Sequence, residues 1–517
     1  MNENLYALLQ SRFPPDRSRP AIEVAGARSY SYAELERITA SYAGFIRLLG
    51  VVPGDRVAAQ VEKSAEALCL YLACLKAGAI YLPLNSAYRE SEIDYFLGDA
   101  EPKIFVHQPK SAAWATAICG KRGIAHQFVL PAEDENTQSV SGSRFWSKSA
   151  LGAPPMLDVA ARNADDLAAI VYTSGTTGRS KGAMITHKNL ASNAITLHQF
   201  WGFQPEDVLL HALPLFHVHG LFVACHTALL NGSKMIFHAK FDAKAAIAAL
   251  PRATVFMGVP TMYVRLLAES SLTRDTCRNM RLFISGSAPL LTETFHEFRQ
   301  RTGHTILERY GMTETGMITS NPLLGDADSR RAGSVGLPLP GVAVRVVEDN
   351  GKACTADAIG QLQVKGDNVL PGYWRLPEKN QEEFTADGYF RTGDVGKIDA
   401  TGYVTIVGRS KDLVISGGYN VYPKEIELLI DEMSGVAESA VIGLPHPDFG
   451  EAVAAIVVKN AAHAEVSEAG VIDALKGKLA AFKVPKRVFI VDDLPRNAMG
   501  KVQKNELRKR YASTFSA

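Results

Sequence analysis

The chain has 517 residues, which is long enough to bury a large core and predicts more than one domain. Its 55 Lys and Arg residues balance 54 Asp and Glu residues, so a formal net charge of +1 disfavours nucleic acid or an anionic membrane as a partner. With 47% hydrophobic and 21% charged residues, the composition excludes the disordered and fibrous classes and is typical of a globular enzyme.

The cysteines and the first residues indicate where the protein works. The six cysteines lie without the paired spacing of a zinc site or of a disulfide framework, which indicates a reducing compartment. The opening sequence MNENLYALLQSRF lacks a basic start and an apolar signal core, and Lys76 interrupts the apolar stretch 68–84. We therefore expect a cytoplasmic protein with no membrane segment.

Helices and strands alternate along the first half of the chain. Residues 62–77 carry apolar side chains at helical spacing and end at Gly78, before the apolar run 79–84, which predicts a helix followed by a buried strand. Between residues 109 and 165 the pattern weakens into Ser, Gly and Ala, which predicts surface elements without a role in the chemistry.

Two later regions combine strands with polar loops. Residues 167–173 have strand character and run directly into a Ser/Gly/Thr-rich loop, which a second short strand and a helix from about residue 188 follow. Residues 402–407 and 412–415 resemble strands, and Pro423 fits the first turn of a helix that ends near residue 433. The segment 410–517 then alternates short strands and helices, as expected of a separate small domain.

The loop TSGTTGRSKG at 173–182 has the composition of a phosphate-binding site. Glycines let backbone N–H groups approach an anion, hydroxyl groups donate further hydrogen bonds, and Lys181 supplies positive charge. A P-loop ATPase or kinase is the competing interpretation, but its motif requires Gly immediately before the lysine and a hydroxyl residue after it. Here Ser180 precedes Lys181 and Gly182 follows it, so we reject that motif.

The segment YTSGTTGRSKG at 172–182 resembles the signature of the acyl-adenylate-forming superfamily, which includes acyl-CoA synthetases, luciferases and peptide-synthetase adenylation domains. Further motifs of the superfamily follow in order: KAGAIYLPLN at 76–85, YGMTET at 310–315, YFRTGD at 389–394, GRSKD at 408–412 and PRNAMGK at 495–501. The resemblance implies an α/β fold with a large N-terminal domain of mixed sheets layered with helices (1–409). A small, mobile C-terminal α+β domain (410–517) would follow, with its hinge near Lys411.

The resemblance implies a reaction in two halves. ATP first adenylates a carboxylate with loss of pyrophosphate, and the thiol of coenzyme A then attacks the acyl-adenylate. Because a carboxylate must approach a negative α-phosphate, Mg²⁺ and cationic side chains have to neutralise charge in the first half. The implied nucleotide-binding residues are Thr173, Ser174, Gly175, Thr176, Thr177, Gly178, Lys181, Gly286, Ser287, Ala288, Tyr310, Asp394 and Arg409.

Individual roles are carried over from the same motifs. Tyr310 would pack on adenine, Asp394 would accept hydrogen bonds from the ribose hydroxyls, and Arg409 would assist it. Thr313 would bind the α-phosphate, and Glu314 would ligate Mg²⁺. The implied catalytic residues are Lys501, His217 and Thr313, of which Lys501 would reach the carboxylate and the α-phosphate.

Rotation of the small domain would switch the enzyme between the two half-reactions. Rotation at Lys411 would withdraw Lys501 and bring Gly417 and Gly418 to line the thiol tunnel, where glycines suit the close passage of a ligand. The resemblance also implies regulation by acetylation of Lys501, which would remove its positive charge, so a lysine acetyltransferase and a deacetylase are the partners it implies.

The acid is expected to be a small diacid. The resemblance places His217, Ser285 and Met312 at the acyl pocket, and a second carboxylate there would need a cation, for which Arg265 is the candidate. Segments such as LFISGSAPLL at 282–291 and LPRNAMGKVQKN at 494–505 resemble malonate-activating members of the superfamily, so malonate is the expected acid. Val218 and Gly316 stand where several of those enzymes have Thr and Asn, which leaves malonate against methylmalonate open.

Three alternatives remain. The first is a short- or medium-chain acyl-CoA synthetase, and the second is a carrier-protein adenylation domain, although no carrier-like segment follows Lys501. The third is a catalytically silent nucleotide-binding scaffold, which would have no physical need to keep Glu314, Asp394 and Lys501 together.

Overall fold

The computed structural model describes residues 2–132, 140, 143–173, 180–324, 329–416, 419–460, 466–497 and 501–515. Its first large sheet has the strand order β18 (Gly372–Tyr373), β8 (Lys181–Thr186), β7 (Leu167–Thr173), β4 (Ile80–Pro83), β3 (Arg56–Gln60), β5 (Ile104–His107) and β6 (His126–Val129). The second has the order β15 (Leu337–Pro338), β14 (Gly316–Ser320), β13 (Leu307–Met312), β12 (Leu282–Ser285), β11 (Val255–Gly258), β9 (Val208–His211), β10 (Lys234–Phe237), β1 (Pro20–Val24) and β2 (Ser29–Ser31).

Helices lie between these two sheets and on their outer faces. The largest apolar core joins both sheets to α2 (Tyr32–Leu48), α3 (Ala65–Ala77), α7 (His187–Phe200) and α8 (His226–Asn231). The outer face of the first sheet packs on α4 (Glu90–Ala100) and α5 (Ala112–Arg122), and that of the second on α9 (Ala243–Ala249), α10 (Pro260–Leu267) and α11 (Thr292–Thr302). The predicted class of mixed sheets layered with helices is therefore confirmed.

Two smaller sheets follow in the chain. One has the order β16 (Ala343–Val347), β17 (Gly360–Lys365), β19 (Phe390–Ile398) and β20 (Val404–Arg409), and the other β22 (Tyr419–Val421), β21 (Val414–Ser416), β24 (Gly450–Lys459) and β23 (Val436–His446), with β25 (Arg487–Val491) pairing β24. The remaining helices include α1 (Leu5–Ser11), α6 (Trp146–Ala150), α12 (Pro377–Glu383), α13 (Pro423–Asp431), α14 (Glu468–Lys476) and α15 (Lys504–Arg510), with the π-helical segment η3 (His219–Cys225) and the 3₁₀ turn η5 (Ser410–Asp412).

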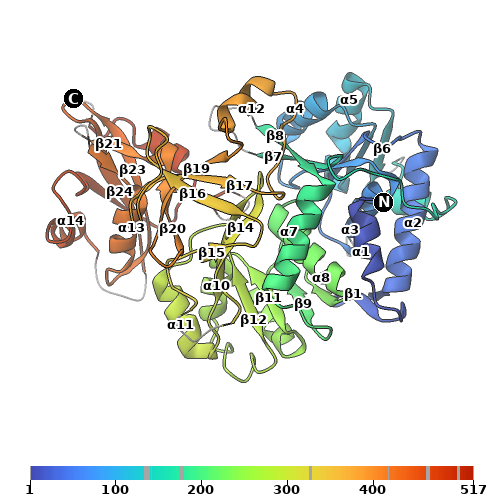
Figure 1. Cartoon of the computed structure of the whole chain (residues 1–517), viewed down its shortest axis with the longest axis horizontal. Helices are drawn as coiled ribbons and strands as arrows, with labels where there is room; N and C mark the ends of the chain where they lie inside the picture. The colour runs from blue at the N-terminus through green and yellow to red at the C-terminus, as the bar shows by residue number, and fades with distance from the viewer. Residues whose placement is uncertain are drawn as a thin grey trace.

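The last sheet belongs to a smaller C-terminal domain. Its apolar cores contain only residues from Val414 onward, and Figure 1 shows it at the end of the molecule opposite the N-terminus, beside the sheet of β16 to β20. A small domain with its own core was expected from the sequence. The boundary at residue 409 and the hinge at Lys411 stay predictions.

Local sequence signals explain several of the predicted elements. α3 begins after Ser64, whose side chain accepts the Ala67 N–H, and ends at Gly78, whose φ of 76° is the left-handed conformation that closes a helix. β7 has the bounds predicted for it. α7 starts one residue before the predicted position, where Thr186 and Asn189 form a capping box.

The expectation for residues 109–165 is wrong in part. This stretch contains α5 and α6, and β6 pairs in parallel with β5 as the last strand of the first sheet. Trp146 is fully buried and contacts Tyr42 and Phe45 edge-on. Apolar residues are sparse here, and packing against distant parts of the chain decides their burial, so a local pattern could not detect it.

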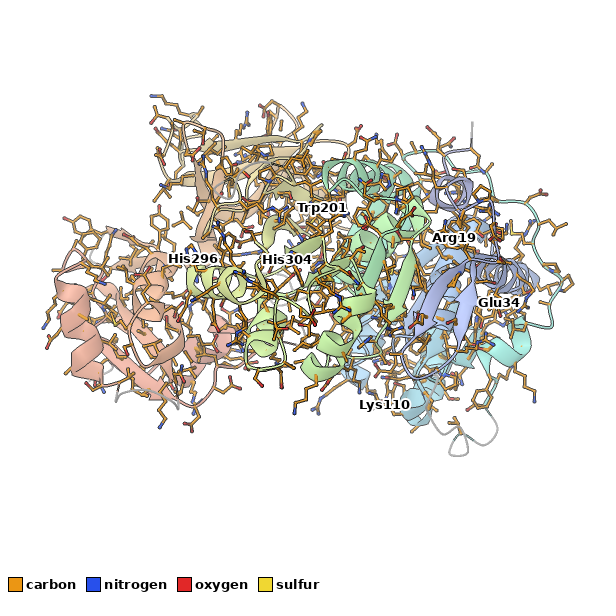
Figure 2. The ribbon with its side chains drawn as sticks, turned by 90° about the horizontal axis from the view of Figure 1, so that it is seen from below. Arg19, Glu34, Lys110, Trp201, His296 and His304 are labelled. Carbon is orange, nitrogen blue, oxygen red and sulfur yellow. The ribbon has the colours of Figure 1, made fainter. Side chains whose placement is uncertain are left out.

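α7 holds the strand that follows the YGMTET segment. The Asn193 side chain donates to the Met317 carbonyl (3.0 Å) and accepts the Met317 N–H (3.1 Å). The indole N–H of Trp201, labelled in Figure 2, donates to Ser320 Oγ over 3.0 Å. The turn between β13 and β14, which carries Glu314, is thereby fixed against a long helix.

In the part of the chain that the structure describes, none of the helices combines the length and the apolar character needed to span a bilayer.

Candidate active site

Three residues predicted from three separate motifs meet at one buried carboxylate. The Tyr310 hydroxyl donates to Asp394 Oδ2 over 2.5 Å, and Arg409 Nε lies 2.7 Å from Asp394 Oδ1. β19 pairs with β20 in a register that sets Asp394 opposite Arg409, while Tyr310 comes from β13. Because Asp394 is only 3% exposed, its charge is balanced locally by Arg409.

Glu314 lies beside Thr173, the first residue of the phosphate loop. Thr173 Oγ1 donates to Glu314 Oε1 (3.3 Å), and the Tyr373 hydroxyl donates to the same oxygen (3.1 Å). Glu314 is buried, and this burial raises the pKa of its carboxyl group. Lys181 forms an ion pair of 3.3 Å with Glu383 on α12. The expected phosphate-loop residues Ser174, Gly175, Thr176, Thr177 and Gly178 lie outside the described residues.

The residues present fit a magnesium site completed by phosphate groups. Among the described residues, no cluster of three or more His, Cys, Asp or Glu side chains could hold a metal by itself. Mg²⁺ prefers oxygen ligands and is commonly held by one or two carboxylates together with substrate phosphates. Glu314 supplies such a carboxylate beside Thr173, the first residue of the phosphate loop.

Arg309 is a buried cation beside the expected acyl pocket. Its side chain comes from β13 and is 2% exposed, and burial lowers its pKa to about 9. Within the described residues, neither its Nε nor its Nη2 has a hydrogen-bond partner. Gly286 packs against the guanidinium so closely that an added Cβ would lie 2.6 Å from Arg309 Cζ. The expected adenine loop therefore borders this cation.

Two histidines contribute to the same region. His217 Nδ1 accepts the His219 N–H (3.3 Å), so a neutral His217 ring carries its proton on Nε2. Burial, Arg309 and Lys501 lower the pKa of His217 to about 4, which keeps the ring neutral. His219 is buried, with its Nδ1 3.3 Å from Ser287 Oγ. Ser287 has a φ of 72°, a strained conformation for a residue with a side chain.

The remaining acyl-pocket residues lie at different depths. Ser285 is fully buried at the end of β12, and its Oγ has no hydrogen-bond partner among the described residues. Met312 is partly buried and packs against the largest core, and Thr313 lines a small cavity together with Val218 and Gly316. Ala288 follows Ser287 in the loop after β12 and is partly buried.

The structure does not support Arg265 as the cation of a dry pocket. Its side chain is exposed on α10, whose buried residues are Pro260, Tyr263, Leu266 and Leu267. Residue 265 lies off that stripe, so the helix directs it away from the core. The buried cation next to the predicted site residues is Arg309.

Lys501 lies beside the nucleotide residues. Lys501 is exposed, yet desolvation of its ammonium group by the surrounding protein and then the positive charge of Arg409 lower its pKa to about 8, while Asp394 opposes the shift. Its backbone N–H donates to Asn497 Oδ1 (2.9 Å), and α15 follows directly. Arg508 on α15 pairs with Asp412, next to the expected hinge Lys411, at 2.8 Å. Gly417 and Gly418 lie outside the described residues.

The sequence motifs do not predict three of the residues that contact the site: Arg309, Tyr373 and Glu383. Arg309 stands directly before the YGMTET motif, and a cation that continues a buried strand is a signal that could have found it. Tyr373 and Glu383 contact Glu314 and Lys181 only through folding of a distant segment, so no local signal marks them.

Comparisons with known proteins agree with this arrangement. Residues 11–374 match the family described as AMP-binding enzyme, and residues 425–501 match the AMP-binding enzyme C-terminal domain. The malonate–CoA ligase of Arabidopsis thaliana is 37% identical over 501 residues, which cover 91% of this chain and 80% of the relative.

A solved structure is similar over its whole length. ATP-bound MatB from Rhodopseudomonas palustris is 53% identical, with a TM-score of 0.95 and 100% of both chains covered. Apo MatB from the same organism has the same identity and coverage but a TM-score of 0.83. The arrangement of this chain is thus more similar to that of the ATP-bound relative.

Proposed function

This chain belongs to the AMP-binding enzyme family, and from that premise we propose that it joins malonate to coenzyme A at the expense of ATP. Malonate and ATP give malonyl-adenylate and pyrophosphate, and coenzyme A then gives malonyl-CoA and AMP. The enzyme is an AMP-forming acid–thiol ligase.

Arg309 is the observation that carries the choice of a diacid. A guanidinium that is 2% exposed and lacks a partner on Nε and Nη2 among the described residues is costly, because burial removes its hydration. A carboxylate that enters the pocket would supply the missing charge and hydrogen bonds. Malonate has such a second carboxylate, whereas acetate and other monoacids do not.

The chain's own groups suit the first half-reaction. A neutral His217 that is protonated on Nε2 can donate to an incoming carboxylate oxygen without taking its charge. Lys501 and Arg409 supply positive charge where negative groups must approach one another. Glu314 would hold Mg²⁺, which when bound neutralises part of the triphosphate charge.

The roles expected for the other site residues stay part of this proposal. Rotation at Lys411 would exchange Lys501 for Gly417 and Gly418 between the two half-reactions. Acetylation of Lys501 by a lysine acetyltransferase would remove its charge, and a deacetylase would restore it. The six free cysteines support the proposed cytoplasmic location, where thiols stay reduced.

Replacement of the buried arginine tests the substrate. We expect Arg309→Leu to leave the second carboxylate unpaired at a cost of about 3–5 kcal/mol. The kcat/KM for malonate should therefore fall by roughly 10² to several times 10³, by the rule of tenfold per ~1.4 kcal/mol. The kcat/KM for propionate or butyrate should hold or rise, because monoacids gain nothing from the cation. The measurement is pyrophosphate release with malonate, methylmalonate, acetate, propionate, butyrate and octanoate, with and without coenzyme A.

Arg265→Leu is the matched variant. Its side chain is exposed, so we expect the preference for malonate to stay as in the unmodified enzyme. If Arg265→Leu loses the preference for malonate while Arg309→Leu keeps it, Arg265 is the cation that binds the second carboxylate, as the sequence suggested. If Arg309→Leu lowers kcat/KM equally for every acid, the role of Arg309 is purely structural.

A further inference from the structure

Tyr373 contacts the two charged side chains that are expected to face the triphosphate. Its hydroxyl donates to Glu314 Oε1 over 3.1 Å, and Lys181 Nζ lies 4.3 Å from the centroid of its ring. Tyr373 is 3% exposed. A phenol is suited to both contacts, since its O–H hydrogen-bonds a carboxylate while the negative face of its ring attracts an ammonium group.

The backbone around Tyr373 is fixed on both sides. β18 pairs with β8, which sets Tyr373 opposite Ala183, and the Tyr373 N–H donates to Asn380 Oδ1 on α12 over 2.7 Å. Gly372 packs closely on the same side chain, since an added Cβ would lie 2.4 Å from Asn380 Nδ2. Tyr373 therefore has little freedom to move away from its two partners.

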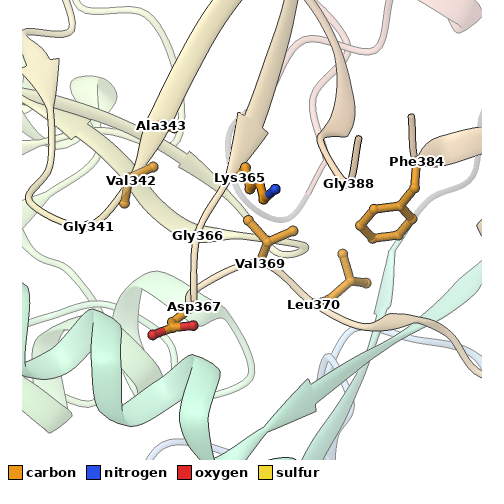
Figure 3. A pocket seen from close by; sticks show the side chains of 10 residues that line it. All are labelled: Gly341, Val342, Ala343, Lys365, Gly366, Asp367, Val369, Leu370, Phe384 and Gly388. Atoms are coloured by element: carbon orange, nitrogen blue, oxygen red, sulfur yellow. The ribbon is translucent and has the colours of Figure 1, made fainter. Parts of the chain in front are cut away.

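The same segment also holds the backbone of the metal ligand. The Leu370 N–H donates to the Glu314 carbonyl over 2.9 Å. The Leu370 side chain lines a cavity of about 730 Å³, together with Phe384 and Val369 (Figure 3). Residues 370–373 thus fix Glu314 twice, through its main chain by Leu370 and through its carboxylate by Tyr373.

We infer that Tyr373 is a positioning residue of adenylation. It fixes the distance between the Glu314 carboxylate and the Lys181 ammonium group, so that both can bind a metal-bound triphosphate. The inference rests on the proposed function for the identity of that ligand. Glu383 contacts Lys181 as well, at 3.3 Å, but it does not reach Glu314 by any contact among the described residues. The Tyr373 side chain contacts both charged groups, its hydroxyl reaching Glu314 and its ring Lys181.

Binding of ATP tests the inference apart from turnover. Tyr373→Phe keeps the ring over Lys181 and removes the hydrogen bond to Glu314. We expect calorimetry to show binding of ATP with Mg²⁺ weakened about tenfold, as for loss of a hydrogen bond to a charged group, and binding of ATP without Mg²⁺ unchanged. Tyr373→Leu, which also removes the ring, should weaken ATP binding under both conditions.

Two further arms separate positioning from folding. In a Glu314→Gln background, Tyr373→Phe should have no additional effect on binding of ATP with Mg²⁺, because the charged partner is already lost. Tyr389→Phe is the matched control, since Tyr389 packs on Arg345 at 3.8 Å and should bind ATP as the unmodified enzyme does. The reaction of coenzyme A with supplied malonyl-adenylate should keep its rate in Tyr373→Phe.

The inference is overturned if Tyr373→Phe binds ATP with Mg²⁺ as tightly as the unmodified enzyme. It is also overturned if that variant weakens ATP binding equally with and without Mg²⁺, or slows the thioester half-reaction as much as adenylation. The proposed function fails separately, if the unmodified enzyme releases no pyrophosphate with malonate while it still binds ATP.

Discussion

At the scale of single residues, Lys501 combines a positive charge with a position beside Asp394 and Arg409. Because the proposed reaction needs this charge where the carboxylate meets the α-phosphate, we expect Lys501→Ala to slow adenylation by roughly 10² or more. The attack of coenzyme A on supplied malonyl-adenylate should suffer much less. Pyrophosphate release and thioester formation, measured separately, check this expectation, and an equal loss in both would contradict it.

The lowered pKa of Lys501 predicts how adenylation depends on pH. With a pKa of about 8, Lys501 is charged below that value and loses its proton as the pH rises through it. The kcat/KM for malonate, which reports on the free enzyme, should therefore decline above about pH 8. Lys501→Arg keeps its charge to far higher pH and should lose this decline. A decline that persists in Lys501→Arg would assign it to another group.

At the scale of elements, the turn η5 joins β20 to β21, and β21 is the first strand of the C-terminal sheet. Lys411→Pro fixes the φ angle there, so we expect one arrangement of the domains to be trapped and only one half-reaction to survive. Lys411→Ala, which leaves φ free, serves as the control. If both half-reactions fall equally in a folded Lys411→Pro protein, no rotation takes place at this turn.

Elements with strong end signals could be predicted from the sequence, and elements that depend on tertiary packing could not. Ser64 and Gly78 mark both ends of α3, whereas nothing near β6 or Trp146 indicates that either is buried. The same contrast holds at the site. Motifs located Tyr310, Asp394 and Arg409, which meet in space.

Helical spacing does not favour Arg265 as a residue of a buried pocket. In α10, Tyr263 and Leu266 lie three residues apart on the buried face, and Arg265 lies between them in sequence but off that face. The position of Arg309 directly before the YGMTET motif marks it for attention, but its burial follows from the place of β13 inside the second sheet. Contacts between distant segments, such as Tyr373 with Glu314, were beyond local patterns.

At the scale of the whole molecule, the two domains meet where both contribute to one site. Lys501 belongs to the smaller domain, yet Asp394 and Arg409 of the large domain affect its pKa. Arg508 on α15 bonds Asp412, so the helix after Lys501 is tied to the start of the small domain. Rotation of that domain would thus carry α15 and Lys501 together, as a rigid unit.

The contact between Gly286 and Arg309 constrains how this sequence could diverge. With arginine at 309, any side chain at 286 would collide with the guanidinium, since even a Cβ would come within 2.6 Å of it. Loss of the arginine would remove that contact, and a residue with a side chain could then replace Gly286. Once this happened, simple reversion at 309 would no longer fit. A descendant that had lost Arg309 and then replaced Gly286 could not regain the arginine directly. It would first have to restore glycine at 286 and only then arginine at 309.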